Sequence, residues 1–182
     1  MLAALTTGHK IGLAGAAVVF VGLALVSASK AWNLAGLKCA LAVAGSERMA
    51  AELRRVPSHV RLHVGHLGVI GSVAAFAEGG EWLDELVAHL DGQRDRLAGL
   101  LAAELPGVRL VRPEAGYLAW LDCRAVGLGD DPSEVFLERG RVALSSGLPF
   151  GTEGKGFARL NFGTSGALLT EAVSRMRSAL DG

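Results

Sequence analysis

The segment Val18-Val-Phe-Val-Gly-Leu-Ala-Leu-Val26 runs directly into Ser27-Ala-Ser-Lys30, and this junction decides how the fold is interpreted. An uncharged, valine-rich run is typical of a strand that is buried on both faces of a parallel sheet. The residues that follow it are polar and turn-prone, so the strand ends in side chains that can do chemistry. We therefore expect a buried strand with Ser27 and Lys30 at its mouth.

Lys30 has the setting that a reactive amine needs. Burial at the end of an apolar strand disfavours the ammonium form and lowers the pKa of a lysine, and Schiff-base chemistry requires a neutral amine. The Ser27 hydroxyl and the Lys38 ammonium stand close to it in the sequence, and no Asp or Glu precedes Glu47. Such a cluster suits a small anion such as a phosphate. The spacing alone leaves open that both lysines are ordinary solvated residues.

The rest of the chain alternates between strand and helix patterns. A second apolar run, residues 37–43, is followed by Ser46, which is placed to cap a helix to about residue 55. Two longer helices are predicted at residues 65–78 and 82–105, separated by a double glycine. Further along, the sequence predicts strands at 108–111, 117–121, 142–144 and 157–162, and helices at 132–139 and 167–180. The fold class is therefore α/β, with residues 1–80 and 81–182 as separate domains.

Composition excludes several classes of function. The 18 basic residues balance 18 acidic ones, so no overall field attracts nucleic acid or an anionic membrane. A hydrophobic content of 51% supplies a core and argues against disorder. Cys39 and Cys123 are too few and too far apart for a disulfide framework. This cysteine usage predicts a cytoplasmic protein.

Residues 11–26 leave a membrane-tethered protein as an alternative. They carry no charge, although they are a little short of the about 20 residues that span a bilayer. Lys10, just before this run, also weakly imitates the start of a secretory signal. Because a buried strand explains residues 18–26 equally well, the membrane interpretation is the secondary one.

The lysine segment carries a resemblance to a known family. Ser27-Ala-Ser-Lys-Ala-Trp-Asn-Leu-Ala-Gly-Leu-Lys38 resembles the lysine signature of fold-type I pyridoxal-phosphate (PLP) enzymes of aminotransferase class I/II. The wording Trp-Asn-Leu-Ala-Gly-Leu is most similar to the branch with carbon–sulfur lyases of the cystathionine β-lyase type. Three further segments agree in order, and the resemblance covers roughly residues 27–180: Gly65-His-Leu-Gly68, Gly116-Tyr-Leu-Ala-Trp-Leu-Asp122 and Gly154-Lys-Gly-Phe-Ala-Arg-Leu-Asn-Phe-Gly163.

The resemblance implies the end of a PLP-binding large domain, with a mainly parallel sheet and helices, followed by a small α/β C-terminal domain. It implies that Lys30 forms the Schiff base with PLP and moves the proton of the substrate Cα. Ser27 and Lys38 match the residues that bind the cofactor phosphate, where the family commonly has arginine instead of Lys38. Arg159 matches the arginine that grips the α-carboxylate of the amino-acid substrate. The resemblance also implies a homodimer.

One part of the expected site has no counterpart in this sequence. Enzymes of this fold use an acidic residue to keep the pyridine nitrogen protonated, and no Asp or Glu precedes Lys30. Residues 1–20 also match the family poorly. We therefore expect this chain alone to be catalytically incomplete, and a noncatalytic remnant or an isolated small domain is the main alternative. Transamination and β-elimination both begin with loss of the Cα proton, so the sequence leaves the choice between them open.

Two rival motifs lack their companions. The lysine segment also fits the Ser-x-x-Lys pattern of penicillin-binding enzymes, but the chain contains neither Ser-Asp-Asn nor Lys-Thr-Gly. His59, His63 and His66 have a spacing that imitates zinc ligands. Pro57 and Gly65 oppose one continuous helix there, so we expect no metal site.

Overall fold

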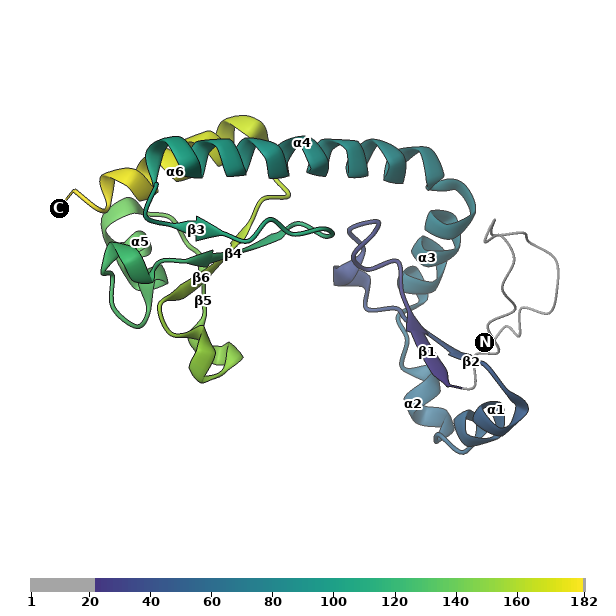
Figure 1. The fold of residues 1–182 in the computed structure, drawn as a ribbon. Helices are drawn as coiled ribbons and strands as arrows, with labels where there is room; N and C mark the ends of the chain where they lie inside the picture. Colours follow the sequence, from purple (N-terminus) through teal and green to yellow (C-terminus); the bar gives the residue numbers. More distant parts are fainter. Residues whose placement is uncertain (1–21, 182) are drawn as a thin grey trace. The chain divides into compact units, whose positions relative to one another are not determined.

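The computed structural model describes residues 22–181. Residues 18–21 of the expected strand, and most of the apolar segment behind the membrane alternative, lie outside this range. The chain divides into two compact units, Met1–Leu83 and Asp84–Gly182 (Figure 1). Among the described residues, no helix is long and apolar enough to cross a membrane. The expected domain division at residue 80 stays a prediction.

The described sheet of the first unit has two strands. β1 (Leu23–Val26) pairs antiparallel with β2 (Leu41–Ala44), so that Val26 lies opposite Leu41. Three of the four β1 residues are exposed, with Leu25 at 77%. The expectation that this strand is buried on both faces is therefore wrong for its described part, because the described residues supply no layers that cover it. The parallel part of the expected sheet stays a prediction.

Short helices follow the two strands. α1 (Glu47–Arg54) begins where the sequence predicts, because the Met49 N–H donates to the Ser46 Oγ at 3.3 Å and so caps the helix. The 3₁₀ turn η1 (Ala35–Leu37) precedes β2. The remaining helices of this unit are α2 (Ser58–Leu62) and α3 (His66–Glu78).

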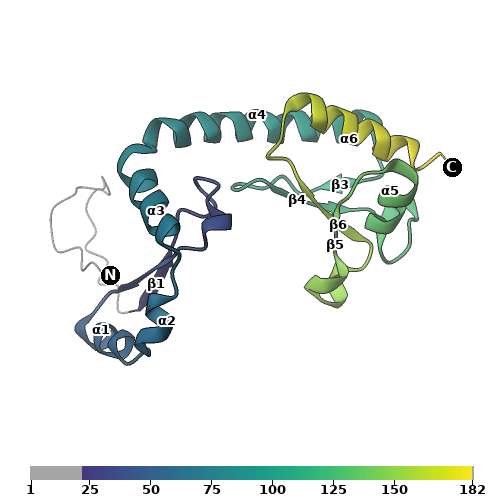
Figure 2. The same cartoon turned by 180° about the vertical axis from the view of Figure 1, so that it is seen from behind.

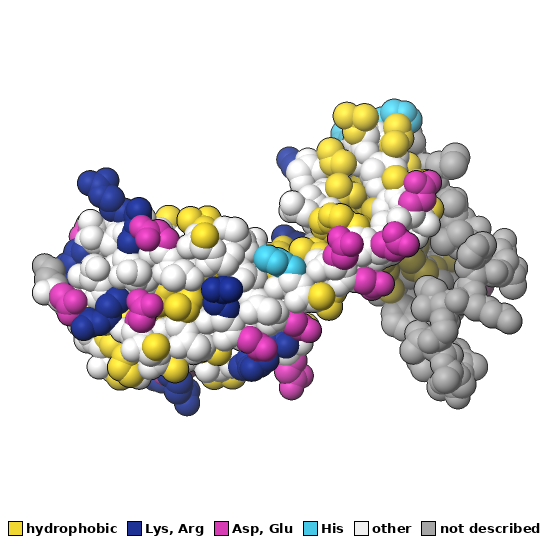
Figure 3. All heavy atoms as spheres, turned by 90° about the horizontal axis from the view of Figure 1, so that it is seen from above, with side chains coloured by type: hydrophobic (Ala, Val, Ile, Leu, Met, Phe, Trp, Pro, Cys, Tyr) yellow, Lys and Arg dark blue, Asp and Glu magenta, His cyan; other side chains and the backbone are white. Residues whose placement is uncertain are grey.

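α3 exposes much of its apolar surface. The exposed large side chains on this helix are Leu67, Val69, Ile70, Val73 and Phe76. Figure 3 shows hydrophobic side chains gathered on the surface of this unit. Its buried positions are small, namely Gly68, Ser72 and Ala75. Small buried residues let another segment of backbone approach the helix closely.

The break between the two longest helices falls at Gly79, the first glycine of the predicted pair, whereas Gly80 already belongs to the second helix. The Gly79 N–H donates to the Ala75 carbonyl at 3.0 Å and ends α3, and α4 (Gly80–Glu104) begins at the next residue. The boundary between the two compact units falls within the first turn of α4.

The second unit combines one antiparallel sheet with helices (Figure 2). The strand order is β3-β4-β6-β5, and every neighbouring pair runs antiparallel. Its strands are β3 (Arg109–Leu110), β4 (Leu118–Asp122), β5 (Ser145–Ser146) and β6 (Phe157–Asn161). Its helices are α5 (Pro132–Gly140) and α6 (Gly166–Ser178), with 3₁₀ turns η2 (Arg124–Val126), η3 (Leu148–Phe150) and η4 (Thr152–Gly154).

The core of the second unit lies on one face of this sheet. Side chains alternate along a strand, and the buried residues of β4 and β6 pack with helical residues from α4, α5 and α6. The largest of these buried side chains are Leu97, Leu101, Leu121, Phe136, Phe162, Leu169 and Met176. Each such side chain contributes about 1.5–3 kcal/mol by leaving water. The opposite face of the sheet is therefore free to carry functional groups.

Candidate active site

The turn after β1 presents Lys30 to solvent. The Ser29 N–H donates to the Ser27 Oγ at 3.3 Å, and the Trp32 N–H donates to the Ala28 carbonyl at 3.0 Å. Ala28 is fully buried, whereas the Lys30 side chain is exposed. The turn is thus anchored at Ala28. The burial that we expected around the Lys30 amine is not supplied by the described residues.

Trp32 ties this turn to the far end of α3. Its Nε1–H donates to the Gly79 carbonyl at 2.8 Å, and its ring meets the Phe76 ring edge-on with centroids 5.0 Å apart. Both contacts use the residue two positions after Lys30. The lysine therefore sits on a backbone that a helix more than 40 residues away holds in place.

Lys38 has an unusual backbone conformation. Its φ of 51° and ψ of 52° lie in the left-handed region, which is uncommon for a residue with a side chain. Its N–H donates to the Ala35 carbonyl at 3.3 Å, which closes η1. The side chain is exposed. This conformation turns the chain sharply before β2 begins.

The donor set around the lysine turn suits a phosphate ester. Among residues 22–181, neither Lys30 nor Lys38 forms an ion pair with another described residue. The Ser27 Oγ accepts a hydrogen bond, and its own hydrogen finds no acceptor within that range. One hydroxyl and two lysine side chains without an ion-pair partner in that range lie on a single short stretch of chain. Such groups bind anions through charge-assisted hydrogen bonds.

Arg159 lies on β6 in the second unit, between two neighbouring strands. It is opposite Trp120 of β4 and Ser145 of β5. Its Nη2 donates to the Ser145 Oγ at 3.2 Å, while its Nε is buried and has no partner among the described residues. A buried donor without a partner is costly. Because this Nε is closed to solvent, a carboxylate would reach the guanidinium at its terminal nitrogens, which can form two parallel hydrogen bonds.

Aromatic rings support the arginine from the same face of the sheet. The Phe150 ring lies under the Arg159 guanidinium, and Trp120 meets Phe150 edge-on with centroids 5.2 Å apart. Trp120 also stacks on Phe157 at 5.6 Å. The sequence did not identify Phe150 or Ser145 as supporting residues. The sequence predicted a glycine-rich loop between these two residues, but it did not predict the path of the loop backbone.

Asp122 lies on the open face of the same sheet but is already paired. It accepts hydrogen bonds from the Arg124 Nε at 2.9 Å and Nη2 at 2.8 Å, and Arg109 lies 3.8 Å away. The hydrogen bond from Arg124 lowers the pKa of Asp122 to about 2. The carboxylate is thus ionised and neutralised locally. It does not compete with a substrate carboxylate for Arg159.

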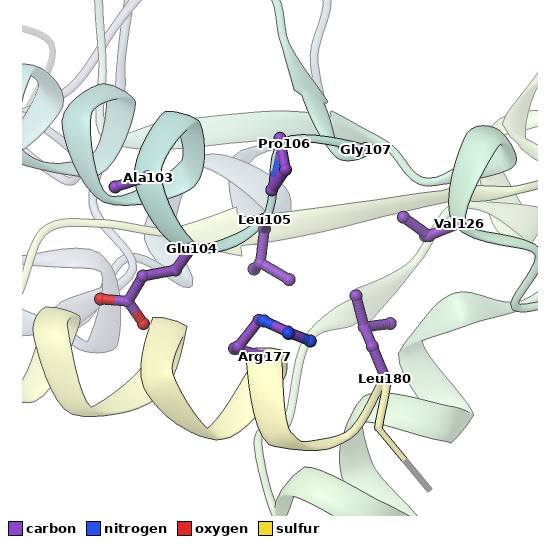
Figure 4. Close-up of a pocket in the computed structure, with 8 residues that line it drawn as sticks. All are labelled: Ala103, Glu104, Leu105, Pro106, Gly107, Val126, Arg177 and Leu180. Carbon is purple, nitrogen blue, oxygen red and sulfur yellow. The ribbon is translucent and has the colours of Figure 1, made fainter.

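None of three other features of the described residues carries the expected chemistry. A hollow of about 420 Å³ lies in the second unit where α4 ends, close to the last turn of α6 (Figure 4). Its lining residues include none of the expected site residues. The described residues contain no group of three or more His, Cys, Asp or Glu that could hold a metal ion. Burial raises the pKa of the Cys123 thiol to about 12, so this cysteine is not a nucleophile at neutral pH.

The expected site residues are divided between the two units. Ser27, Lys30 and Lys38 belong to one stretch of the first unit, and Arg159 belongs to the second unit. Within the second unit, Ser145 and Phe150 contact the Arg159 guanidinium and support it. Each group has the donor chemistry that its expected ligand needs.

Known proteins share both the sequence and the fold. The chain is 50% identical over 174 residues to a protein of Mycobacterium tuberculosis named "Putative cystathionine beta-lyase", a match that covers 86% of this chain and 42% of that protein. It is 33% identical over 167 residues to the cystathionine beta-lyase PatB of Bacillus subtilis, covering 88% of this chain and 42% of the relative. The chain thus spans about two fifths of the length of the curated relatives that it matches.

A solved structure agrees with these relatives. The crystal structure titled a "putative plp-dependent beta-cystathionase" from Corynebacterium diphtheriae superposes with a TM-score of 0.84 at 36% identity, covering 88% of this chain and 42% of that one. Residues 7–176 match the model of the family described as aminotransferase class I and II. The expected α/β fold and family are confirmed, and the chain belongs to the aminotransferase class I and II family.

Proposed function

We propose that this chain forms part of a PLP enzyme that acts on amino acids, either as a carbon–sulfur β-lyase or as an aminotransferase. The observation that carries the proposal is the Lys30 amine, which has no ion-pair partner among residues 22–181, on a turn that is fixed at Ala28 and Trp32. The family membership and the names of the relatives support the same activity. The β-lyase is favoured as the first activity to assay, because the relatives are named for it.

The residues of the lysine turn fit the cofactor. PLP carries a phosphate ester and an aldehyde, and it supplies an electron sink for a bond broken at the substrate Cα. The Ser27 hydroxyl and the Lys38 ammonium would hold the phosphate. Lys38 keeps the charge of the more common arginine but gives up its two-pronged geometry. The Lys30 Nζ would hold the aldehyde carbon.

The chain's own residues then divide the work on the substrate. Arg159 would take the substrate carboxylate on the terminal nitrogens of its guanidinium and so fix the orientation of the amino acid. Ser145 and Phe150 hold the guanidinium for this contact. The Lys30 Nζ, once free, would accept the proton from the substrate Cα and return it as the general acid.

A reduction experiment tests the proposed lysine site. Lysines occur in this chain at positions 10, 30, 38 and 155. Lys155 is exposed, and its pair with Asp130 at 2.8 Å raises its pKa, so it is an internal reference whose lower reactivity the pyridoxal control corrects for. After borohydride reduction with limiting PLP, we expect the pyridoxyl label at Lys30 to exceed that at Lys155 by about tenfold, the ratio that 1.4 kcal/mol of preference gives.

Pyridoxal, which lacks the phosphate, is the matched control for this labelling. The preference for Lys30 should largely disappear with pyridoxal, because Ser27 and Lys38 recognise only the phosphate group. Equal labelling of Lys30 and Lys155 by PLP would contradict the proposal. It would favour the alternative, a noncatalytic protein that binds neither cofactor nor substrate.

We also propose that the protein is a cytoplasmic homodimer. Free, buried cysteines fit a reducing compartment. The exposed apolar side chains of β1 and α3, such as Leu25 and Ile70, supply surface that association can cover. Sedimentation equilibrium tests this proposal. A protein that remains monomeric at all concentrations up to about 100 μM, where even a weak dimer would form, would contradict it.

A further inference from the structure

Gly68 of α3 touches the lysine segment on both sides of Lys38. A Cβ added at Gly68 would collide with the Leu37 carbonyl oxygen, because it would lie closer than the 3.0 Å minimum that Cβ contacts observe. The same Cβ would lie 3.0 Å from the Cys39 Cβ. One of these neighbours is rigid backbone. Only glycine therefore fits at position 68 without a shift of the residues that flank Lys38.

The conformation of Lys38 shows why such a support is needed. A left-handed residue with a Cβ costs roughly 1–2 kcal/mol, and strain of this kind persists only where the surroundings fix it. Lys38 is exposed and its ammonium has no ion-pair partner among the described residues. Its neighbour Cys39 is buried, at 8% exposure. The packing that holds Lys38 in place therefore acts on its neighbours.

The same helix also holds the other end of the segment. The Gly79 carbonyl at the end of α3 accepts the hydrogen bond from Trp32, two residues after Lys30. A Cβ at Gly79 would collide with the Trp32 Nε1. At a rise of about 1.5 Å per residue, Gly68 and Gly79 lie roughly 16 Å apart along α3. One rigid helix thus fixes two separate points of the segment.

We infer that α3 sets the position of Lys38 relative to Lys30, and that Gly68 is the positioning residue for the phosphate-binding end of the site. This inference rests on the proposed function. Gly68 contributes no donor of its own and acts through Leu37 and Cys39. The shift that an added Cβ forces on these residues moves the Lys38 ammonium away from the phosphate, while the Lys30 turn keeps its anchor at Trp32.

Three glycines of α3 provide a matched series for the test. A Cβ at Gly65 would meet the Leu37 carbonyl oxygen at an ordinary 3.5 Å, and a Cβ at Gly71 would meet the flexible end of the Leu37 side chain at 3.1 Å. Gly68→Ala is the test, and Gly65→Ala and Gly71→Ala are the controls. The measurement is the ratio of Lys30 labelling by PLP to Lys30 labelling by pyridoxal in the full chain.

The ratio should fall in Gly68→Ala by about fivefold or more, which corresponds to roughly 1 kcal/mol of lost positioning. It should stay within about twofold of wild type in both controls, below the size of ordinary mutational effects. Labelling by pyridoxal should not change in any variant, because it depends on Lys30 alone. A general loss of structure would also abolish the preference for PLP, so the ratio is compared only among variants whose urea unfolding midpoint stays close to that of wild type.

A second pair of variants changes Cys39, the other partner in the contact with Gly68, in case Gly68→Ala does not fold. Cys39→Gly removes the Cβ that meets α3 and should lower the ratio, whereas Cys39→Ala keeps that Cβ and should not. A wild-type chain without any preference for PLP at Lys30 would overturn the proposed function itself. A wild-type preference that survives both Gly68→Ala and Cys39→Gly would overturn only the positioning role.

Discussion

The guanidinium carbon of Arg159 lies 5.1 Å from the centroid of the Phe150 ring. Phe150 belongs to η3, and Arg159 belongs to β6, nine residues further along the chain. The loop between them returns through Gly151, whose φ of 103° is open to glycine and strained for other residues. The glycine-rich loop therefore has a structural purpose, which is to place an aromatic ring beneath the arginine.

The first prediction concerns the guanidinium of Arg159. Arg159→Lys keeps the charge but loses the planar pair of donors. We expect the variant to bind the carboxylate of a free amino acid such as alanine at least about tenfold more weakly, a loss of roughly 1.4 kcal/mol. The measurement is the shift of the backbone amide resonances of β6 and β5 in an NMR titration.

Arg139→Lys is the control for this titration, because Arg139 is an exposed residue of α5 outside the sheet. The expected result for this variant is wild-type binding. Equal affinities in wild type and Arg159→Lys would remove Arg159 from the carboxylate site.

The second prediction concerns pH and the paired carboxylate of Asp122. The hydrogen bond from Arg124 lowers the folded-state pKa of Asp122 from 3.8 to about 2. A lowered pKa contributes stability that is present above the unfolded pKa and is lost as pH falls through the folded value. This contribution should therefore fade between pH 3.8 and about 2.

Asp122→Asn tests this pH dependence. We expect the variant to be less stable at pH 7 by at most about 1 kcal/mol, because the side chain of Arg124 is largely exposed and water screens the pair. The stability difference from wild type should shrink as the pH falls towards 2. Urea unfolding at a series of pH values measures it, and a difference that does not vary with pH would count against the pair.

The sequence predicted elements whose signals are local. The cap at Ser46, the break at Gly79 and the helix that starts near Gly166 depend on a few adjacent residues, and each is present. The strands predicted at 117–121 and 157–162 also match β4 and β6 to within one residue at each end. The donor types of the site could be named for the same reason.

Features that depend on distant contacts were not predictable from the sequence. The strand predicted from residue 37 begins at Leu41, because η1 and the left-handed Lys38 occupy the intervening positions. Gly68, about 30 residues later, provides the contact that permits this path. Similarly, the predicted strand at 142–144 forms instead at Ser145–Ser146, where it can pair with Arg159 and Ala158.

The third prediction concerns the anchor of the lysine turn. Trp32→Phe keeps an aromatic ring beside Phe76 but removes the hydrogen bond to the Gly79 carbonyl. We expect a loss of about 0.5–1.5 kcal/mol in the free energy of unfolding of the first unit. Amide hydrogen exchange of residues 29–38 should accelerate in the folded protein.

Trp82→Phe is the control for this exchange measurement, because the exposed Trp82 has no aromatic partner or hydrogen bond among the described contacts. That variant should leave exchange in the lysine turn unchanged. If Trp32→Phe also leaves it unchanged, the hydrogen bond to Gly79 does not hold the turn.

The last prediction separates stability from function at Lys38. Lys38→Gly relieves a left-handed conformation that costs a residue with a Cβ roughly 1–2 kcal/mol. Part of this gain is offset because glycine loses more chain entropy on folding, by roughly 0.5–1 kcal/mol. Lys38→Gly should therefore unfold at a slightly higher urea concentration than wild type, while its Lys30 label loses the preference for PLP over pyridoxal. Lys38→Ala, which loses the same charge but keeps the strain, should lose that preference without any gain in stability. A gain in stability together with a loss of PLP preference in Lys38→Gly is the result expected of a strained residue that binds the phosphate. A Lys38→Gly variant that is neither more stable nor less selective for PLP would show that Lys38 is an ordinary surface lysine.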